Sequence, residues 1–401
     1  MPQADTFPRL KLVIFLIVAF SGMGMSVILP ILAPLIRELG LTESQGGWMV
    51  SVGSVVMAAT GAMWGGLSDK WGRKAILLIG FGGLFATYII YTLIVGFGLN
   101  GALSGGLLFA SLLIGRSLVG AFLAAAPSSA QALMADTTTP ETRSAGMSVI
   151  SAASGVGLVV GPAIGGILAL PGLIWPLVLT TVICATGLVL VWRLVPVTPP
   201  RLSHTDRPRL KPTHNGLWAW LLAAFFTMSS IVTVQISAGF YFQDKLGLST
   251  HDTGPALAIG FTLVGVALII TQIIQMRLLR WRPRQMILGG ATLWIIAMLI
   301  LLNSQVAAGF YVAFALAGSG AGLLMPGFNA GASLSVSDEH QGAVAGFIAM
   351  MQASGAIVAP IGSTLLYEQG RSLPFWAIIG LMVTLGALFL LRNPVRAKAE
   401  P

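Results

Sequence analysis

The segment Gly65-Gly66-Leu67-Ser68-Asp69-Lys70-Trp71-Gly72-Arg73-Lys74 lies between two long apolar runs and is the most informative part of this chain. It reads as a charged turn of about ten residues with the pattern Gly-x-Leu-x-Asp-x-x-Gly-Arg-Lys. Lone charges beside an apolar span are costly whereas pairs are tolerated, so Asp69 and Arg73 are expected to pair. Gly65 and Gly72 are expected to permit close approach and tight turning.

Composition places the apolar runs in a membrane. The chain has 401 residues, of which 56% are hydrophobic and only 9% are charged, and its mean hydropathy is +0.88. A soluble domain carries roughly 25% charged residues, so this chain cannot cover a water-facing surface. The 49 glycines suit the close packing of helices in lipid. The single cysteine, Cys184, excludes an intramolecular disulfide and is expected to be a small buried hydrophobe.

The apolar runs repeatedly reach the ~20 residues that a helix needs to cross the hydrocarbon core. The first run is too long for a signal peptide and lacks a convincing cleavage site, so we interpret it as a span. We therefore predict an all-α membrane protein with twelve transmembrane helices, at about residues 11–36, 47–67, 75–97, 104–134, 144–169, 173–192, 216–242, 253–276, 285–303, 306–333, 341–367 and 372–391.

The basic residues predict the orientation of these spans. With the N-terminus in the cytoplasm, eighteen of the 22 Lys and Arg residues fall on cytoplasmic segments. Only Arg37, Lys245 and Arg371 fall on external loops, and Arg116 is left inside a span. This asymmetry follows the positive-inside rule and places both termini in the cytoplasm. The net charge of +9 is thereby explained by topology, without a nucleic-acid partner.

One long polar break, at residues 193–215, divides the spans into two sets of six. It holds five prolines and five basic residues, which is typical of a linker. The predicted domains are an N-terminal six-helix bundle at 1–192, a cytoplasmic linker at 193–215 and a C-terminal six-helix bundle at 216–401.

The two halves echo each other weakly. Ala153-Ser154-Gly155 in the fifth span recurs as Ala353-Ser354-Gly355 in the eleventh. Lys70-Trp71-x-x-Lys74 recurs as Arg280-Trp281-x-x-Arg284. Duplicated halves with a substrate site between them are typical of secondary transporters.

The segment at residues 65–74 resembles the loop between the second and third helices of the major facilitator superfamily of secondary transporters. That resemblance implies the major facilitator fold, with two six-helix halves that rock about a central cavity. It also implies that the loop latches the two halves when the protein faces outward, with Asp69 engaging a helix end or an arginine. The expected gating residues are Gly65, Asp69, Gly72, Arg73 and Lys74.

Arg116 and Gly120 form a second element of the resemblance, in the fourth span. Arg116-Ser117-Leu118-Val119-Gly120 is similar to the Arg-x-x-x-Gly element of the same superfamily, where it is associated with proton transfer or an acidic partner. An arginine inside an apolar run is a functional-site hypothesis by default. The alternative is an arginine that snorkels to the external interface.

The fifth span carries the clue to the direction of transport. Residues 155–166 resemble the Gly-x-x-x-Gly-Pro-x-x-Gly-Gly element of the drug/proton antiporter branch, on the positions Gly157, Gly161, Pro162, Gly165 and Gly166. Proline inside a helix removes a hydrogen bond and kinks it, and the glycines offer a smooth face to a neighbouring helix. A passive structural kink is the alternative.

Two weaker echoes support the same branch. Asp136 to Arg143 follows the fourth span and looks like the acidic-to-arginine loop common in these antiporters. Pro30 and Pro34 in the first span resemble their proline pair. Serine, threonine and proline turns are common, so neither echo is specific alone.

The chain departs from this branch because no Asp or Glu lies in the middle of a span. Asp69, Asp136 and Asp244, each at the end of a span, are the substitutes for a coupling carboxylate. The membrane interior offers one cation, Arg116, and amides that face the cavity or bridge helices; the cavity candidates are Gln131, Gln235, Gln272, Asn329 and Gln352, and Gln275 is a further interior amide. A cavity with a cation and no anion disfavours cationic solutes and suits neutral or anionic amphipathic ones.

Other classes fit less well. A membrane enzyme would need a polar catalytic cluster, but the four histidines lie in loops without metal-ligand spacing, and no Gly-x-x-x-x-Gly-Lys phosphate loop is present. A channel would need a charged ring or a filter loop. An importer or uniporter of a small organic anion or other metabolite on the same fold stays open.

The resulting prediction is an exporter of a small amphipathic solute (a drug, a metabolite or a siderophore-like compound), driven by proton antiport. We expect it in a bacterial inner membrane, as a monomer, without enzymatic activity, metal or cofactor. Its partners are the solute, protons and the lipid bilayer.

Overall fold

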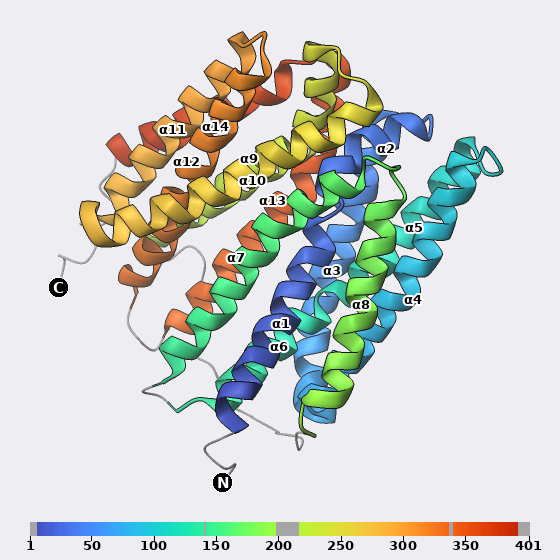
Figure 1. Cartoon of the computed structure of the whole chain (residues 1–401). Coiled ribbons are helices and arrows are strands. Elements are labelled where there is room, and N and C mark those ends of the chain that lie inside the picture. Colours follow the sequence, from blue (N-terminus) through green and yellow to red (C-terminus); the bar gives the residue numbers. More distant parts are fainter. Residues whose placement is uncertain (1–5, 140–141, 198–215, 337–339, 392–401) are drawn as a thin grey trace. The chain divides into compact units, whose positions relative to one another are not determined.

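The computed structural model describes residues 6–139, 142–197, 216–336 and 340–391 (Figure 1). These residues form helices and no strands, and twelve helical stretches among them are long and apolar enough to cross a membrane. The all-α class and the twelve predicted spans are confirmed. The elements are α1 Thr6–Ser26, 3-10 helix η1 Leu29–Ile31, α2 Leu32–Glu38, α3 Glu43–Trp71, α4 Arg73–Leu99, α5 Gly105–Leu123, α6 Ala125–Thr137, α7 Arg143–Leu168, α8 Trp175–Leu194, α9 Leu217–Leu246, α10 Thr250–Ile274, π-helical segment η2 Gln275–Leu279, α11 Pro283–Asn303, α12 Ala307–Leu334, α13 Gln341–Gln369 and α14 Leu373–Leu391.

Two predicted spans are interrupted, and proline accounts for each break. The first span changes from α1 through η1 to α2 around Pro30, which cannot donate a backbone hydrogen bond. The fourth span divides into α5 and α6 at Ala124. Pro127 follows three residues later, where its ring opposes the carbonyl group of Leu123, four residues back.

The charged segment at residues 65–74 is mostly helical, which corrects the predicted turn of about ten residues. α3 continues to Trp71 and α4 begins at Arg73, so only Gly72 separates them. Gly72 has φ 88° and ψ 155°. L-amino acids rarely adopt this conformation, so the junction depends on glycine.

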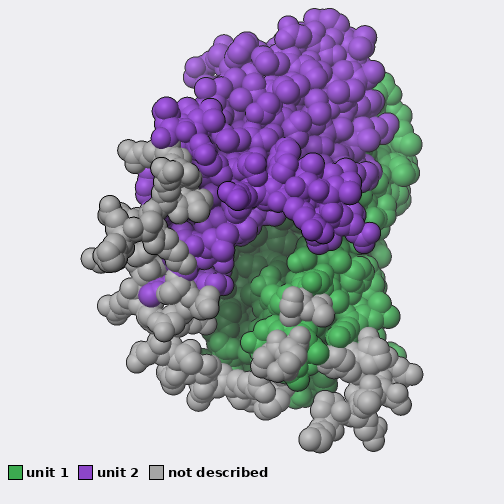
Figure 2. All heavy atoms as spheres, turned by 90° about the vertical axis from the view of Figure 1, so that its left-hand side faces the viewer, with its two compact units in different colours: residues 1–204, 249–258 green, residues 205–248, 259–401 purple. Residues whose placement is uncertain are grey.

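The chain separates into two compact units, which Figure 2 colours differently. Unit 1 comprises residues 1–204 and 249–258, and unit 2 comprises residues 205–248 and 259–401. The predicted limits of the bundles and linker stay a prediction, and residues 198–215 of that linker lie outside the described residues.

Each unit has its own apolar core. In unit 1, fully buried residues from several helices meet, including Ile14 of α1, Phe81 of α4 and Ala130 of α6. In unit 2, α9 is the most buried of the described spans. Its aromatic side chains contact those of α12 and α14: the ring centroids of Phe242 and Phe310 are 4.5 Å apart, and those of Trp220 and Phe389 are 4.8 Å apart.

Large apolar side chains also point outward. Ile114 is 62% exposed, Leu107 66% and Leu390 63%. A soluble protein scatters such residues singly, whereas here they occur along the apolar spans throughout the described chain. This outward apolar surface is what a multi-pass membrane protein presents to lipid.

Candidate functional site

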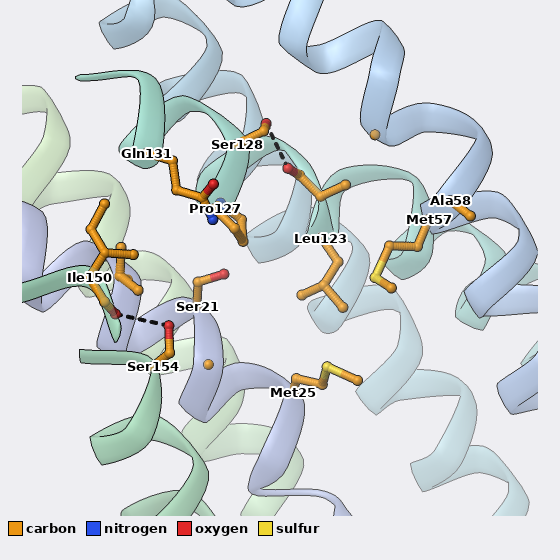
Figure 3. A pocket seen from close by; sticks show the side chains of 14 residues that line it. Ser21, Met25, Met57, Ala58, Leu123, Pro127, Ser128, Gln131, Ile150 and Ser154 are labelled. Carbon is orange, nitrogen blue, oxygen red and sulfur yellow. Dashed lines mark hydrogen bonds between the residues drawn. The ribbon is translucent and has the colours of Figure 1, made fainter. Parts of the chain in front are cut away.

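A pocket of about 500 Å³ lies within unit 1 (Figure 3). It is lined by α1, α3, α6 and α7 and by the junction between α5 and α6. In Figure 3, Ile150 and Ser154 lie at one side of the pocket and Met57 and Ala58 at the other. Leu123, Ala124 and Pro127 also line it, so the proline-dependent break in the fourth span shapes the pocket wall.

The pocket lining is apolar with neutral polar groups and contains no charged side chain. Two of its hydroxyls are satisfied within their own helices, because Ser128 donates to the carbonyl oxygen of Ala124 and Ser154 to that of Ile150. Gln131 is exposed and forms no hydrogen bond with the other described residues. Met25 and Met57 add two flexible thioether side chains, which adapt to irregular or aromatic ligands.

The structure places only one of the predicted cavity amides in this pocket. Gln131 lines it, whereas Gln235, Gln272, Asn329 and Gln352 lie on four different helices of unit 2. The Asn329 amide donates to the carbonyl oxygen of Met325 in its own helix at 2.7 Å. The further amide Gln275 donates to the carbonyl oxygen of Trp281 at 3.2 Å and is buried at the start of η2.

Arg116 lies against α3 and α4. Its side chain crosses Gly53, where an added Cβ atom would be 3.2 Å from the Arg116 Cγ. The Arg116 guanidinium interacts electrostatically with the hydroxyls of Tyr88 and Tyr91. The Tyr88 hydroxyl in turn donates to the carbonyl oxygen of Gly24 in α1 at 3.0 Å.

The Arg-x-x-x-Gly spacing has a physical reason here. Residues four apart share a helix face, so Arg116 and Gly120 both meet α3 at Gly53. A Cβ atom on Gly120 would collide with the carbonyl oxygen of Gly53. Gly120 therefore allows the close approach that lays the arginine across Gly53. No carboxylate among the described residues forms an ion pair with Arg116, and Arg116 is absent from the lining of the pocket.

A glycine face joins α7 to α1. A Cβ atom on Gly157 would lie 2.9 Å from the carbonyl oxygen of Ala19 and 3.0 Å from the backbone nitrogen of Met23. Gly161 and Gly165 meet Ser26 and the backbone of Val27 in the same way. The repeat of four residues places these three glycines on one face of α7.

Ser26 adds a hydrogen bond to this contact. Its buried hydroxyl donates to the carbonyl oxygen of Gly157 at 2.8 Å. Gly166 faces another segment of unit 1, where its Cβ atom would collide with Ala258. Pro162 lies inside α7 and supplies no N–H group. Because Gly22 lines the pocket and also contacts Gly157, the glycine contact continues the pocket wall.

Two of the predicted gating residues, Asp69 and Arg73, belong to a compact ionic cluster at the junction of α3 and α4. Arg73 is only 7% exposed. Its Nε donates to Asp136 Oδ2 at 2.9 Å, and its Nη1 donates to Asp69 and, at 3.2 Å, to the Ser68 hydroxyl. The cluster thus joins this junction to the last turn of α6.

Neighbouring residues hold the ends of the helices around this cluster. Arg143 Nη2 donates to the carbonyl oxygen of Ala135 at 3.2 Å, and Lys74 Nζ donates to that of Trp192 at 2.9 Å. Cations beside the last carbonyl groups of a helix stabilise its end. Gly65 does not show the expected close approach, because nothing described lies within 4 Å of its added Cβ atom.

Asp244 lies in unit 2, near the end of α9. It belongs neither to the pocket nor to the ionic cluster at Arg73, which are both in unit 1. Its Oδ2 accepts a hydrogen bond from the Tyr367 hydroxyl at 2.7 Å and pairs with Arg371 Nε at 3.2 Å. Its side chain is 15% exposed. This carboxylate is therefore held between a tyrosine and an arginine of its own unit.

Sequence reasoning missed Ser26, Tyr88 and Met57. A serine or tyrosine in an apolar span has no distinctive pattern, so its helix partner was not readable from the sequence. The described residues contain no cluster of three or more His, Cys, Asp or Glu that could hold a metal ion. Cys184 is a free, buried thiol.

Comparison with protein families identifies the chain's relatives. A model of the Major Facilitator Superfamily matches residues 14–360 and, in a second match, residues 277–401. "Tetracycline resistance protein, class G" from Vibrio anguillarum is 28% identical over 399 residues, covering 96% of this chain and 97% of that protein. "Multidrug resistance protein 1" from Bacillus subtilis (strain 168) is 24% identical over 395 residues, covering 96% of each.

Solved structures share the fold at low identity. A bacterial homologue of the human lysosomal transporter Spinster has a TM-score of 0.76 at 14% identity, over 99% of this chain and 98% of that one. The human organic anion transporter MFSD10 (TETRAN) has a TM-score of 0.67 at 18% identity, over 97% of this chain and 100% of that one.

Proposed function

Because the chain belongs to the Major Facilitator Superfamily, a family of transporters rather than enzymes, we propose that it exports a small amphipathic solute by proton antiport. The observation that carries this proposal is the neutral, mostly apolar pocket in unit 1, with the amide of Gln131 in its lining. Pockets of this kind bury the apolar body of a ligand and orient it through a few polar groups. Full-length similarity to tetracycline and multidrug resistance proteins supports export.

Charge narrows the solute class. A permanent cation entering a low-dielectric pocket needs a compensating anion, and the pocket lining offers no carboxylate. Arg116 is the one cation of the fourth span and lies beside two tyrosine hydroxyls rather than a carboxylate. The lining itself suits neutral solutes, such as uncharged drugs, and an anionic solute, such as a carboxylate-bearing metabolite or a siderophore-like compound, would depend on Arg116 outside the lining. Neither the lining nor Arg116 offers a counter-charge to a cation.

Proton coupling is assigned to carboxylates at the ends of spans. Asp136 and Asp69 share Arg73, and Asp244 is held by Tyr367 and Arg371. Protonation of any of these carboxylates would weaken its bond to the arginine. A proton can thereby loosen an ionic contact as the transporter changes state.

The wider assignment follows the transporter mechanism. Two six-helix bundles, at 1–192 and 216–401, rock about the central cavity while the ionic cluster at Arg73 acts as a gate. We place the protein in the inner membrane with both termini and the 193–215 linker in the cytoplasm. The working unit is a monomer.

Transport into everted inner-membrane vesicles tests the proposal. We expect accumulation of a neutral or anionic amphipathic solute when an inside-acid proton gradient is imposed, and loss of accumulation when the gradient is collapsed. Vesicles from cells without the protein serve as the negative control. Accumulation of permanent cations in preference to anions would contradict the assignment of the solute class.

An importer or uniporter of a small organic anion is the alternative. Arg116 favours it, because a cation in a span can bind an anionic metabolite moving in either direction. The same vesicles separate the two functions. Uptake that is unaffected by collapsing the proton gradient, and that equilibrates without accumulation, would establish the uniporter.

A further inference from the structure

We propose that the junction between α10 and α11 is a binding site for the phosphate headgroups of anionic phospholipids. The site consists of Arg277, Arg280 and Arg282, and we call it the arginine junction. Arg277 lies near the end of the candidate span that finishes at Leu279, and Arg280 and Arg282 lie between that span and the one that begins at Pro283, so the site lies at the membrane surface. This site is independent of the solute that the protein carries.

The comparison with the matching junction in the first half motivates the proposal. Lys70-Trp71-x-x-Lys74 and Arg280-Trp281-x-x-Arg284 are equivalent segments. In the first, Arg73 is neutralised within unit 1 by Asp69 and Asp136. At the same offset the second has Leu279 in place of Asp69 and Pro283 in place of Arg73. The second junction therefore stays basic at the positions of Lys70 and Lys74, as Arg280 and Arg284, and lacks the carboxylate of Asp69.

The three arginines are exposed and have no counter-charge among the described residues. None of them takes part in an ion pair or a side-chain hydrogen bond there, whereas Arg284 donates to the carbonyl oxygens of Phe389 and Leu390 at the end of α14. Arg284 is thus used inside the protein. The other three guanidinium groups are left to face an external anion, and a guanidinium fork matches the geometry of a phosphate.

The backbone of the junction is held in place, which makes it a formed site rather than a loose charged loop. The Gln275 amide donates to the carbonyl oxygen of Trp281, and the Arg280 backbone N–H donates to that of Gln275 at 2.8 Å. Arg280 itself has φ 48°, the one positive φ among the described non-glycine residues. Holding a non-glycine residue there costs energy that the surrounding hydrogen bonds must offset.

Apolar side chains around the arginines suit the acyl chains beside such a headgroup. Met276 is 68% exposed and Leu278 is 76% exposed. Trp281 packs against α11 at Gly289, where an added Cβ atom would lie 2.6 Å from the indole ring. Tryptophan at the end of a span is typical of the membrane–water interface. Charge and apolar surface together indicate a lipid, with its phosphate on the arginines and its chains on the methionine and leucine.

Lipid titration of the full-length protein in neutral detergent tests the site. Phosphatidylglycerol or phosphatidylcholine is added, and bound lipid is counted by native mass spectrometry alongside the melting temperature. We expect wild-type protein to bind phosphatidylglycerol in preference to phosphatidylcholine. Each arginine near an anionic surface contributes about fivefold in affinity, so Arg277→Gln/Arg280→Gln/Arg282→Gln should weaken phosphatidylglycerol binding at least tenfold.

Three comparisons make the result specific. Lys70→Gln/Arg193→Gln/Lys245→Gln removes the same amount of charge elsewhere and should keep the binding. Arg→Lys replacement at the three junction positions should retain part of it. The three single Arg→Gln variants, each on an exposed residue, provide the same test if the triple variant does not fold.

Three results would overturn the proposal. The first is equal affinity for phosphatidylglycerol in the wild-type protein and the junction variants. The second is an increase in melting temperature with inorganic phosphate alone that matches the increase with phosphatidylglycerol, since the site would then be one for a free anion. An equal loss in the control triple variant would also refute it, because binding would depend on net charge alone.

Discussion

At the scale of single residues, Arg73 connects the members of the ionic cluster, because Asp69 and Asp136 both pair with its guanidinium group. It is buried and donates to Asp69, Asp136 and Ser68, whereas the Asp69 side chain is 46% exposed. Breaking a buried pair by removing one partner costs about 3–5 kcal/mol, so Arg73→Gln should lower the melting temperature clearly. Asp69→Asn should leave folding and expression nearly intact but abolish most transport. Thermal unfolding in detergent and vesicle transport separate the two effects, and wild-type transport by Asp69→Asn would contradict the gating role.

Arg116 is the second residue whose environment makes a prediction. Its neighbours among the described residues are the hydroxyls of Tyr88 and Tyr91, whereas the family resemblance associated this arginine with proton transfer or an acidic partner. An unpaired arginine in a membrane costs at least about 2.5–3.5 kcal/mol, and these hydroxyls offset part of that cost. We expect Arg116→Lys to keep partial transport, Arg116→Ala to lose anionic solutes and Arg116→Glu to shift the preference toward cations. Tyr88→Phe is the matched control for the structural part of the effect, and normal anion transport by Arg116→Ala would refute a role in binding.

At the scale of elements, the glycines of α7 differ in how closely they approach α1, and this difference makes a prediction. A Cβ atom on Gly157 would press on the backbone of α1, which cannot yield as a side chain can, whereas a Cβ atom on Gly155 meets nothing within 4 Å. Overpacking of this kind typically costs about 1–3 kcal/mol. Gly157→Ala should therefore destabilise the protein and impair transport, and Gly155→Ala should be close to wild type. Similarly, Gly161→Leu should block transport more than Leu158→Ala, whose side chain is 40% exposed. Equal and mild effects of all four changes, measured by melting temperature and vesicle transport, would make this contact passive.

The same elements show what the sequence could predict. Apolar length alone located all twelve spans, because a helix in lipid must be both long and apolar. The break at Ala124 was not predicted, because a proline such as Pro127 inside an apolar run does not by itself indicate that a helix ends. The helical course of Gly65 to Trp71 was also missed, because charges and glycines are typical of turns in water. The close approach was expected at Gly65 and is found at Gly53 and Gly120. Which face of a helix meets a neighbour is a tertiary property that a glycine pattern does not encode.

At the scale of the whole molecule, the predicted coupling carboxylates form ion pairs within their own units. The carboxylates Asp69, Asp136 and Asp244 each have a basic partner within their own unit. The sequence predicted the pair of Asp69 and Arg73 from their spacing, but the inclusion of Asp136 depends on the approach of α6 to the junction of α3 and α4. The same holds for the predicted cavity amides. Gln131 lines a pocket and Asn329 bonds to its own helix, but the sequence around a polar residue in an apolar run does not distinguish these two outcomes.

The distribution of basic residues over the whole chain makes a prediction about orientation. With the N-terminus inside, eighteen of the 22 Lys and Arg residues lie on the cytoplasmic side, and reversing the chain would place this excess outside against the positive-inside rule.

Single-cysteine labelling tests this orientation. The natural Cys184 is buried, so a Cys184→Ser background provides a chain suited to such labelling. We expect a cysteine introduced at Trp281 to react with a membrane-impermeant maleimide in everted vesicles and not in intact cells. A cysteine introduced at Ala102, which is exposed in the loop between α4 and α5, should show the opposite behaviour. Labelling of both positions from the same side would contradict the number of spans between them, and exchange of the two patterns would reverse the proposed orientation.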